Sequence, residues 1–265
     1  MDDTLSEILK AVKQRKGVDF SRYRHETVAR GVANRMAARG CESAVAYLPH
    51  VGYEPEECEA FLAELAINVS SFFRNPMVYE ILGQRLIPEL LEEKRREGRR
   101  EVWVWSAGCA MGEEPYSVAI LLHEAIQADN SRWTVHVFAT DINEKVLDYA
   151  RSGIYPEERL QDAKMGIVLK YFSTCPGGYE LASEIRNRVV FSRDDLTSPA
   201  LAAPADSVFG AFDLVLCRNV LIYMDSDLAG DVYRKLHRSL NPGGYLVLGE
   251  AETLAPELHG PTTRK

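Results

Sequence analysis

The 265-residue chain contains few cysteines, and none of them has a spacing typical of metal or redox sites. The five cysteines lie far apart and form no C-x-x-C pair: Cys41, Cys58, Cys109, Cys175 and Cys217. An odd number of scattered cysteines argues against a disulfide framework and against a structural zinc site. We therefore expect free thiols, a reducing cytoplasmic location and no bound metal.

The sequence also lacks long apolar runs and an excess of basic charge. No stretch of about 18 apolar residues exists, so we expect no membrane span, and the opening MDDTLSEILK lacks the apolar core of a signal peptide. With 31 basic and 39 acidic residues, the net charge of −8 disfavours binding to nucleic-acid phosphates. Apolar residues make up 46% of the chain, which is enough for a folded core and argues against disorder.

Charge is nevertheless distributed unevenly along the chain. Residues 10–39 hold nine basic side chains, among them Arg30, Arg35 and Arg39, against only Asp19 and Glu26. A local charge of this sign would attract a partner with an acidic surface at short range, because salt screens the attraction beyond about 10 Å. The same run is equally compatible with a solvated helix face that has no partner.

The first hundred residues favour helices separated by glycine and proline. Gly17 and Gly40 stand where two predicted helices end, and Asn75-Pro76 breaks the chain before a further helix. The polar run EEKRREGRR then marks a boundary. We predict an α-helical N-terminal domain over residues 1–76, a linker helix over residues 77–100 and a second domain over residues 101–265.

After Arg100, short apolar runs alternate with helical stretches. The runs are EVWVWSA, TVHVFATDI, RVVFSRDDL, DLVLCRNV and GGYLVLGE. Runs that are apolar throughout are typical of parallel strands buried on both faces, and strand–helix alternation predicts a doubly wound α/β sheet. In such a sheet, ligands bind beyond the carboxyl ends of the strands, so the residues that follow each strand are candidates for a site.

The loop after the first predicted strand, residues 106–117, contains two glycines but no phosphate-binding motif. Gly108 and Gly112 permit a tight turn, yet neither G-K-[ST] nor G-x-G-x-x-G is present. Glu113 and Glu114 stand at the start of the next helix, where they would repel a pyrophosphate. A cationic or zwitterionic ligand such as S-adenosylmethionine therefore fits this loop better than a dinucleotide.

Three other strand ends carry polar residues. Asp141 ends the second strand, where an acid can accept hydrogen bonds from both ribose hydroxyls or can cap the next helix. Asp195 and Leu196 follow the third strand and would meet an adenine amine and ring, although acids after strands are also common in turns. Residues 217–223 follow the fourth strand and should face the reacting methyl group. The N-P-P-[YF] sequence of amino-directed nucleic-acid methyltransferases is absent.

Arg74 lies beside paired aromatic residues in the segment NVSSFFRNP, residues 68–76. An arginine in such a segment is commonly structural. Its planar guanidinium can also bind a carboxylate, of cofactor or of substrate, through two parallel hydrogen bonds.

Six blocks together resemble the CheR-type chemotaxis receptor methyltransferases over most of residues 19–252. These blocks are NVSSFFRNP, VWSAGCAMGEEPYSVAI, ATDIN, ARSGIY, FDLVLCRNVLIYM and NPGGYLVLG. The resemblance implies an all-α N-terminal domain followed by a Rossmann-type class I methyltransferase sheet with a small β-subdomain insertion. We place this insertion at about 172–191, with a hairpin turn at 176–178.

The resemblance also implies methyl transfer from S-adenosyl-L-methionine to glutamate side chains in the cytoplasmic helical domain of chemoreceptors, with S-adenosyl-L-homocysteine as product. The residues that match the family's cofactor contacts are Asn68, Ser70, Arg74, Glu113, Asp141, Asp195, Leu196, Arg218 and Asn219. The second helix resembles the family's basic docking helix, which makes Arg30, Arg35 and Arg39 candidates for receptor docking.

The sequence departs from the family pattern at several points. Ser70 stands where threonine is typical, and Asp195 stands where asparagine is typical, so the adenine contact loses an amide donor. Gly31 and Asn34 replace residues that are often basic, which predicts weaker or retuned docking. The final HGPTTRK comes before the closing strand of the family, as in a shortened form.

A glutamate carboxylate is ionised at neutral pH, so the expected reaction requires no general base. Arg74 and Arg218 would position the carboxylate, and Tyr223 would border the methyl group. Three alternatives stay open: the same chemistry on a receptor of a non-chemotaxis pathway, a non-catalytic module that binds the cofactor, and a nicotinamide oxidoreductase. We expect a monomer that neither enters a membrane nor binds nucleic acid.

Overall fold

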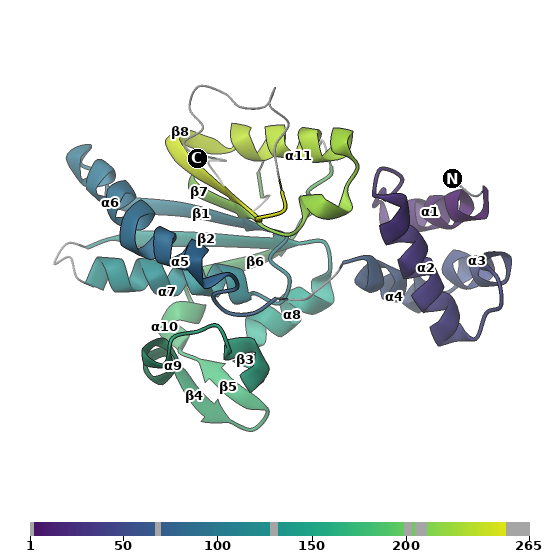
Figure 1. The fold of residues 1–265 in the computed structure, drawn as a ribbon, viewed down its shortest axis with the longest axis horizontal. Coiled ribbons are helices and arrows are strands. Elements are labelled where there is room, and N and C mark those ends of the chain that lie inside the picture. Colours follow the sequence, from purple (N-terminus) through teal and green to yellow (C-terminus); the bar gives the residue numbers. More distant parts are fainter. Residues whose placement is uncertain (1–2, 67–69, 128–131, 199–202, 205–210, 253–265) are drawn as a thin grey trace.

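The computed structural model describes residues 3–66, 70–127, 132–198, 203–204 and 211–252. Four helices come first: α1 (Asp3–Lys16), α2 (His25–Arg39), α3 (Ala44–Tyr53) and α4 (Pro55–Leu65). They pack around one apolar cluster that includes Ile8, Val28 and Phe61. Helix α2 ends at Gly40, whose positive φ of 66° lets its amide bond back to the last turn, as the sequence predicted. Figure 1 shows this group of helices at one end of the molecule.

A second helical stretch joins these helices to the sheet. It consists of α5 (Pro76–Ile81), the π-helical η1 (Leu82–Leu86) and α6 (Ile87–Arg96). Pro76 occupies the first turn of α5, where its missing N–H costs no hydrogen bond. Lys94 near the end of α6 forms a buried ion pair with Asp213, with 2.7 Å between Nζ and Oδ2. The stretch is therefore anchored to the sheet by both apolar packing and charge.

The main sheet is parallel throughout and has the order β6-β2-β1-β7-β8. Its strands are β1 (Glu101–Ala107), β2 (Thr134–Asp141), β6 (Val189–Arg193), β7 (Phe212–Cys217) and β8 (Leu240–Leu248). Helices α7 (Glu113–Gln127) and α8 (Glu144–Ser152) cover one face, and α11 (Ser226–Arg238) covers the other (Figure 1). The doubly wound α/β fold predicted from the alternating runs is thereby confirmed.

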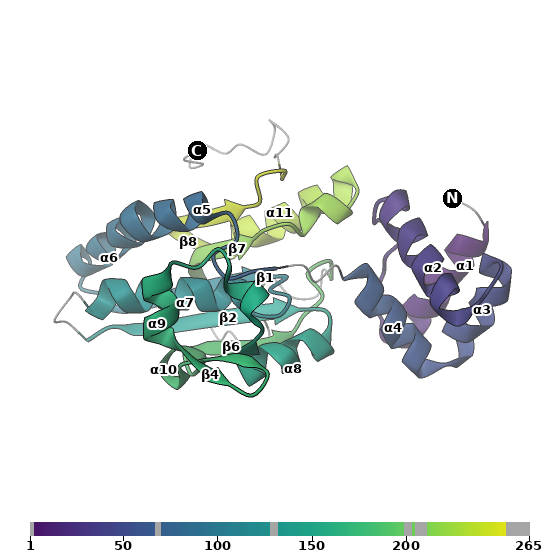
Figure 2. The same cartoon turned by 60° about the horizontal axis from the view of Figure 1, so that its bottom comes forward.

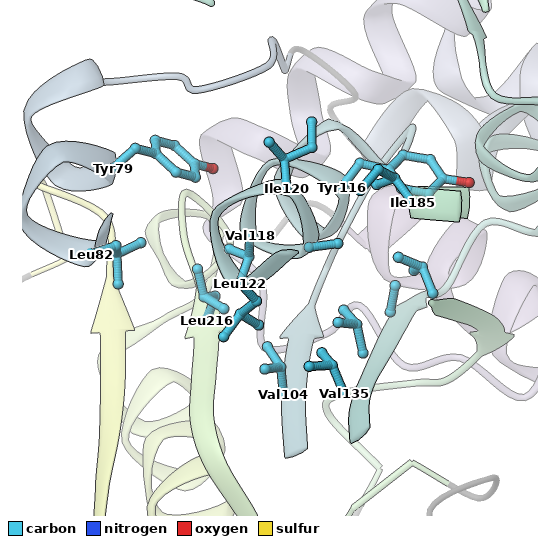
Figure 3. Close-up of a cluster of buried hydrophobic side chains, with 14 of the residues drawn as sticks. Tyr79, Leu82, Val104, Tyr116, Val118, Ile120, Leu122, Val135, Ile185 and Leu216 are labelled. Atoms are coloured by element: carbon cyan, nitrogen blue, oxygen red, sulfur yellow. The ribbon is translucent and has the colours of Figure 1, made fainter. Parts of the chain in front are cut away.

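Two apolar clusters lie on opposite faces of this sheet because each buried strand points alternate side chains to each side. Val104 and Leu216 face α7, where they pack with Val118 and Leu122 (Figure 3). Residues of the opposite parity, such as Trp105, face α11. Burial on both faces is what makes the strands read as continuous apolar runs.

A small antiparallel sheet of order β3-β5-β4 lies outside the main sheet. It contains β3 (Ile154–Tyr155), β4 (Phe172–Cys175) and β5 (Gly178–Leu181), with η2 (Glu157–Leu160), α9 (Met165–Tyr171) and α10 (Ser183–Arg186) around it. The pairing of Cys175 with Gly178 confirms a hairpin turn at Pro176-Gly177. The range predicted for the insertion, about 172–191, misses β3 and ends inside β6 of the main sheet. A two-residue strand leaves no periodic pattern in a sequence, which explains the omission.

The N-terminal helices meet the sheet at the carboxyl ends of its strands, as Figures 1 and 2 both show. The chain between α1 and α2 pairs with the chain after β7 through an antiparallel bridge between Tyr23 and Met224. The amide of Arg24 donates to the carbonyl of Tyr223 at 2.9 Å, and the amide of Asp225 donates to the carbonyl of Arg22 at 2.9 Å. This contact brings the N-terminal helices over the edge where a doubly wound sheet holds its ligand.

Candidate cofactor site

A cavity opens at the carboxyl edge of the main sheet and encloses about 1050 Å³ of empty space, its open mouth included. Its walls come from the ends of β1, β2, β6 and β7, from residues 70–79, and from the N-terminal helical part of the chain. The sequence-predicted residues that line it are Ser70, Arg74, Asp141, Asp195, Leu196, Arg218, Asn219 and Tyr223. The structure thus brings together residues from Ser70 to Tyr223, which are far apart in the sequence.

The remaining predicted residues lie elsewhere. Glu113 is fully buried at the start of α7 and does not line the cavity directly. Asn68 lies outside the described residues. Arg30, Arg35 and Arg39 are on α2, away from the cavity lining.

The loop after β1 and the end of β2 are tied together by Asp141. One carboxylate oxygen of Asp141 accepts from the amide of Ala110 at 2.9 Å, and the other accepts from the amide of Asn143 at 3.0 Å. The cap of α8 is Asn143 and not Asp141, because the Asn143 side chain accepts from the amide of Lys145. Burial raises the pKa of Asp141, although its backbone hydrogen bonds oppose this rise. Asp141 therefore holds a buried carboxylate at the tip of β2.

Glycines in the loop permit close approach of its neighbours. Gly108 has a φ of 73°, and a Cβ there would lie 2.5 Å from a methyl carbon of Val220. Gly112 has a φ of 90°, and its Cβ would lie 2.8 Å from that of Ala150. Any other residue would push the loop away from the end of β7 or from α8.

Backbone strain is concentrated around the cavity. In the described part of the chain, the non-glycine residues with positive φ are Phe73, Asn75, Ala110 and Asn219. Ala110 and Asn219 line the cavity, while Phe73 and Asn75 flank Arg74. Left-handed backbone is unfavourable for residues with a side chain and commonly persists where a site requires it. The hydrogen bond from the Phe73 amide to the Ser117 hydroxyl, 3.0 Å, helps to hold this conformation.

Glu113 is a buried carboxylate with little to neutralise it. Neither of its oxygens has a hydrogen-bond partner among the described residues, and the closest opposite charge is Arg159, 3.3 Å from Oε1. Burial raises the pKa of Glu113, and Arg159 offsets only part of this rise. The same guanidinium donates to the backbone carbonyl of Ser70, which lines the cavity. A buried anion of this kind is suited to a cationic group that enters beside it.

Arg218 is held by several groups at once. Its Nη2 atom donates to Asn75 Oδ1 at 2.9 Å and to the carbonyl of Arg74 at 3.0 Å, and its Nη1 atom lies 3.6 Å from Glu114 Oε2. The guanidinium also lies over the ring of Tyr79, 5.5 Å from the centroid. The structure therefore shows Arg218 joining the end of β7 to residues 74–79, while its predicted hold on a carboxylate stays a prediction.

Glu252 is a residue that the sequence analysis missed. Its carboxylate accepts from the amides of Asn219, Val220 and Leu221 at 2.9, 2.7 and 2.7 Å, and from the amide of Gly249 at 2.5 Å. These groups begin the turn η3 (Leu221–Tyr223), whose first amides have no partner within the turn. Glu252 thus fixes the turn that carries Asn219 into the cavity.

Other cavity residues were also missed. Phe20 and Tyr23 come from the N-terminal part of the chain. Glu114, which the sequence analysis named for its charge alone, lines the cavity from α7. Asp194 lines the cavity beside Asp195, and one of its oxygens is buried without a hydrogen-bond partner among the described residues. Burial raises the pKa of Asp194, and Lys235 at 3.9 Å offsets part of this rise. Because Asp194 and Asp195 are adjacent at a strand end, the sequence pattern that predicted Asp195 as a site residue could also have predicted Asp194.

The three arginines predicted to dock a receptor differ in their surroundings. Arg35 donates two hydrogen bonds to the buried Glu57, at 2.9 and 2.7 Å, and so joins α2 to α4. Arg39 pairs with Glu54 at 2.7 Å. Arg30 is exposed and has no hydrogen bond or ion pair with any described residue. Unlike Arg35 and Arg39, Arg30 therefore has a positive charge that no described residue neutralises.

Among the described residues, no group of three His, Cys, Asp or Glu side chains is arranged to hold a metal ion. Nor does any helix within those residues combine the length and the apolarity that crossing a membrane requires.

Replacing Glu252 with glutamine should lower the free energy of unfolding by about 1 to 3 kcal/mol. Glutamine keeps a single acceptor oxygen and turns an NH₂ group toward amides that also donate. Urea unfolding followed by circular dichroism measures the loss. Glu250→Gln is the matched control, because Glu250 is exposed two residues away. Equal stability of the two variants would show that the turn does not depend on this carboxylate.

Two family models match the chain. The model described as "CheR methyltransferase, SAM binding domain" matches residues 68–262, and "CheR methyltransferase, all-alpha domain" matches residues 3–66. A magnesium protoporphyrin IX methyltransferase structure from Synechocystis PCC 6803 is 22% identical over 63% of this chain and 55% of its own, with a TM-score of 0.32. A superposition this loose adds nothing to the family match.

Similar sequences point the same way. A 104.1 kDa protein of Rhodobacter capsulatus is 32% identical over 95% of this chain, which spans only 26% of that relative. A "Chemotaxis protein methyltransferase" of Salmonella typhimurium is 33% identical over 94% of this chain and 83% of its own. A "Probable biofilm formation methyltransferase WspC" of Pseudomonas aeruginosa is 30% identical over 98% of this chain and 58% of its own. Because these two family models together cover residues 3–66 and 68–262, the protein belongs to the CheR methyltransferase family.

Proposed function

We propose that this chain transfers a methyl group from S-adenosyl-L-methionine to glutamate side chains of methyl-accepting chemotaxis receptors, which forms glutamyl methyl esters for sensory adaptation. The observation that carries the proposal is the buried carboxylate of Glu113, near a cavity lined by Glu114, Asp141 and Asp194. It accepts no hydrogen bond from the described residues, and its counter-charge is the Arg159 guanidinium at 3.3 Å. Such a site favours a cationic ligand and disfavours a phosphate. The Salmonella typhimurium relative is named a chemotaxis protein methyltransferase, which agrees with the receptor substrate that the family resemblance implies.

The cavity residues fit the cofactor group by group. Glu113 would accept from the ammonium group, which would neutralise its buried charge. Asp141 has a further lone pair on each oxygen for the ribose hydroxyls. Asp195 also retains acceptor capacity for the adenine amine, because its bonds to Thr197, at 2.9 and 2.6 Å, use only Oδ1. Arg74 would bind the carboxylate of the amino acid.

The remaining family positions complete this assignment as proposals. Ser70 and Asn219 line the same cavity, and Leu196 supplies an apolar surface for the adenine ring. Arg218 lines this cavity too and joins the end of β7 to residues 74–79. Asn68 is included on the resemblance alone.

When bound, S-adenosyl-L-methionine supplies an electrophilic methyl carbon on a sulfonium. In the transfer, a glutamate oxygen forms a bond to that carbon while the carbon–sulfur bond breaks, and the electron pair stays on sulfur. The protein therefore has to orient the carboxylate and exclude water, without moving a proton. Arg74 and Arg218 line the cavity and would orient the substrate carboxylate, and Tyr223, which also lines it, would border the methyl group as a positioning residue.

Substrate docking is assigned to the helical part of the chain. We propose that residues 1–76 dock the receptor, residues 77–100 link and residues 101–265 catalyse. Arg30 presents an unpaired positive charge on α2, and an acidic helical surface of a receptor would complement it. Arg35 and Arg39 support the same surface while they pair with Glu57 and Glu54.

A second candidate substrate is a receptor of a different chemosensory pathway. The relative from Pseudomonas aeruginosa is named for biofilm formation, and it resembles this chain over nearly the whole length of the chain. The chemistry and the site would be the same. We also propose that the protein acts in the cytoplasm as a monomer.

Incubation with methyl-labelled S-adenosyl-L-methionine and a receptor cytoplasmic fragment should transfer label that base releases as methanol. Tyr223→Phe should retain turnover within about tenfold, because no proton is transferred at that position. Binding of S-adenosyl-L-homocysteine without any transfer would support the non-catalytic module instead. Tight binding of NAD with none of the adenosyl compounds would support an oxidoreductase.

Affinity for S-adenosyl-L-homocysteine should fall as the pH is lowered from 7.5 to 5. Burial raises the pKa of Glu113, so this carboxylate gains a proton at a higher pH than an exposed glutamate and then no longer attracts an ammonium group. Titration calorimetry across this range measures the effect. Glu113→Gln should bind about tenfold to a hundredfold more weakly at pH 7.5 and show a shallower pH dependence.

Glu124→Gln is the matched control for Glu113→Gln, because Glu124 lies on the same helix and its pKa is lowered by hydrogen bonds from Lys170 and Tyr171. It should bind with the affinity and pH profile of the unmodified chain. A Glu113→Gln variant with that same profile would remove Glu113 from the cofactor site.

Arg30→Glu should lower kcat/KM for the receptor fragment about threefold to tenfold at low salt, with the affinity for S-adenosyl-L-homocysteine unchanged. Arg85→Glu is the control, because Arg85 is also exposed but lies on η1, outside the N-terminal helices, where it pairs with Glu89. Raising the salt concentration should shrink the difference between the variants, since exposed charges are screened. An unchanged kcat/KM for Arg30→Glu would remove this charge from the docking surface.

A further inference from the structure

The cavity has a wall that does not belong to the sheet. Phe20, Tyr23, Leu65 and Ala66 line it from the N-terminal helical part of the chain. Phe20 and Tyr23 come from the connection between α1 and α2, and Leu65 and Ala66 come from the end of α4. A ligand in the cavity would therefore touch both parts of the protein.

Tyr23 is held in this wall from two sides. Its backbone forms the bridge to Met224, and the neighbouring hydrogen bonds of Arg22 and Arg24 extend the pairing to three residues on each chain segment. On the other side, its ring meets the ring of Phe20 edge to face, with 4.8 Å between centroids. Tyr23 packs against both the N-terminal apolar cluster and the cluster that contains Leu196. Its position is thus set before any ligand arrives.

The surroundings of Tyr23 connect it to two carboxylates of the site. Burial raises the pKa of its hydroxyl, and the charges of Asp195 and Asp141 raise it further, so the hydroxyl stays protonated at neutral pH. This hydroxyl makes no hydrogen bond with any residue in the described ranges. A flat ring with an unused donor, placed near the acids at the ends of β2 and β6, is a suitable surface for a purine nucleoside.

We propose that Tyr23 binds the nucleoside half of the cofactor, with its ring against the adenosine and its hydroxyl as a donor. The inference rests on the proposed function, because Asp141 and Asp195 locate the nucleoside. It follows that the cofactor joins the N-terminal helices to the sheet. Cofactor binding would then further stabilise the connection between α1 and α2, which leads directly into the helix proposed to dock the receptor.

Titration calorimetry with two ligands tests this contact. S-adenosyl-L-homocysteine carries both halves of the cofactor, whereas 5′-methylthioadenosine lacks the amino acid. Tyr23→Leu keeps apolar contact with Phe20 but removes the flat ring, and it should weaken the binding of both ligands by the same factor, about tenfold. Tyr23→Phe keeps the ring, and its affinity for both ligands should fall about threefold or less, which is the effect of losing one hydrogen bond.

Tyr53→Leu is the matched control, because Tyr53 is exposed at the end of α3 in the same helical part. It should bind both ligands as the unmodified chain does. In the unmodified chain, 5′-methylthioadenosine should also slow amide hydrogen exchange in residues 18–24, a measurement that needs no variant.

Three outcomes are distinguishable. If the unmodified chain binds neither adenosyl compound, the proposed function itself fails. If it binds both, but Tyr23→Leu binds them with unchanged affinity and residues 18–24 gain no protection, the proposed contact is overturned. If Tyr23→Leu loses affinity for S-adenosyl-L-homocysteine alone, Tyr23 belongs to the amino-acid half and the inference is wrong.

Discussion

The main physical constraint on this structure is a group of buried carboxylates at the carboxyl edge of its main sheet. Glu113, Glu114, Asp141 and Asp194 are all shielded from water, and burial raises the pKa of each. Burying a carboxylate costs several kcal/mol unless it is paired. Arg159, Arg218 and Lys235 lie near these acids, but at 3.3, 3.6 and 3.9 Å they are looser than well-formed ion pairs. A positively charged ligand would relieve the remaining imbalance, and this is the physical basis for selecting a sulfonium nucleoside over a phosphate.

The parallel sheet explains why much of this edge was predictable. Strand ends of a doubly wound sheet share one side, so Asp141, Asp195 and Asn219 could be assigned to one site from the positions of the apolar runs alone. Gly108 was predictable for a similar reason, since only glycine adopts its conformation without cost so close to Val220. The resemblance to the family added Ser70, and it supported Arg74, which its own chemistry had already made a candidate.

Other features depend on contacts between distant segments, and local sequence patterns do not carry such contacts. Glu252 binds amides about 30 residues earlier in the chain, and Tyr23 pairs with Met224 across about 200 residues. Arg35 is a case in which the sequence pattern suggested a free charge and the structure shows a paired one. In the sequence it is one charge of a basic run, whereas in the structure Glu57 is a buried anion that requires it. A run of charge thus predicts the field around a helix but not which charges are free to meet a partner.

The N-terminal helices can therefore contribute to the reaction as well as to docking. A carboxylate and a sulfonium lose their charges as they react, so a site that holds back water favours the transition state over the separated ions. Phe20, Tyr23 and Leu65 supply the apolar wall that the sheet edge alone would leave open. Backbone hydrogen bonds attach the segment that carries Phe20 and Tyr23 to Tyr223–Asp225, and the same segment leads directly into α2, so one contact fixes both the wall of the cavity and the start of this helix.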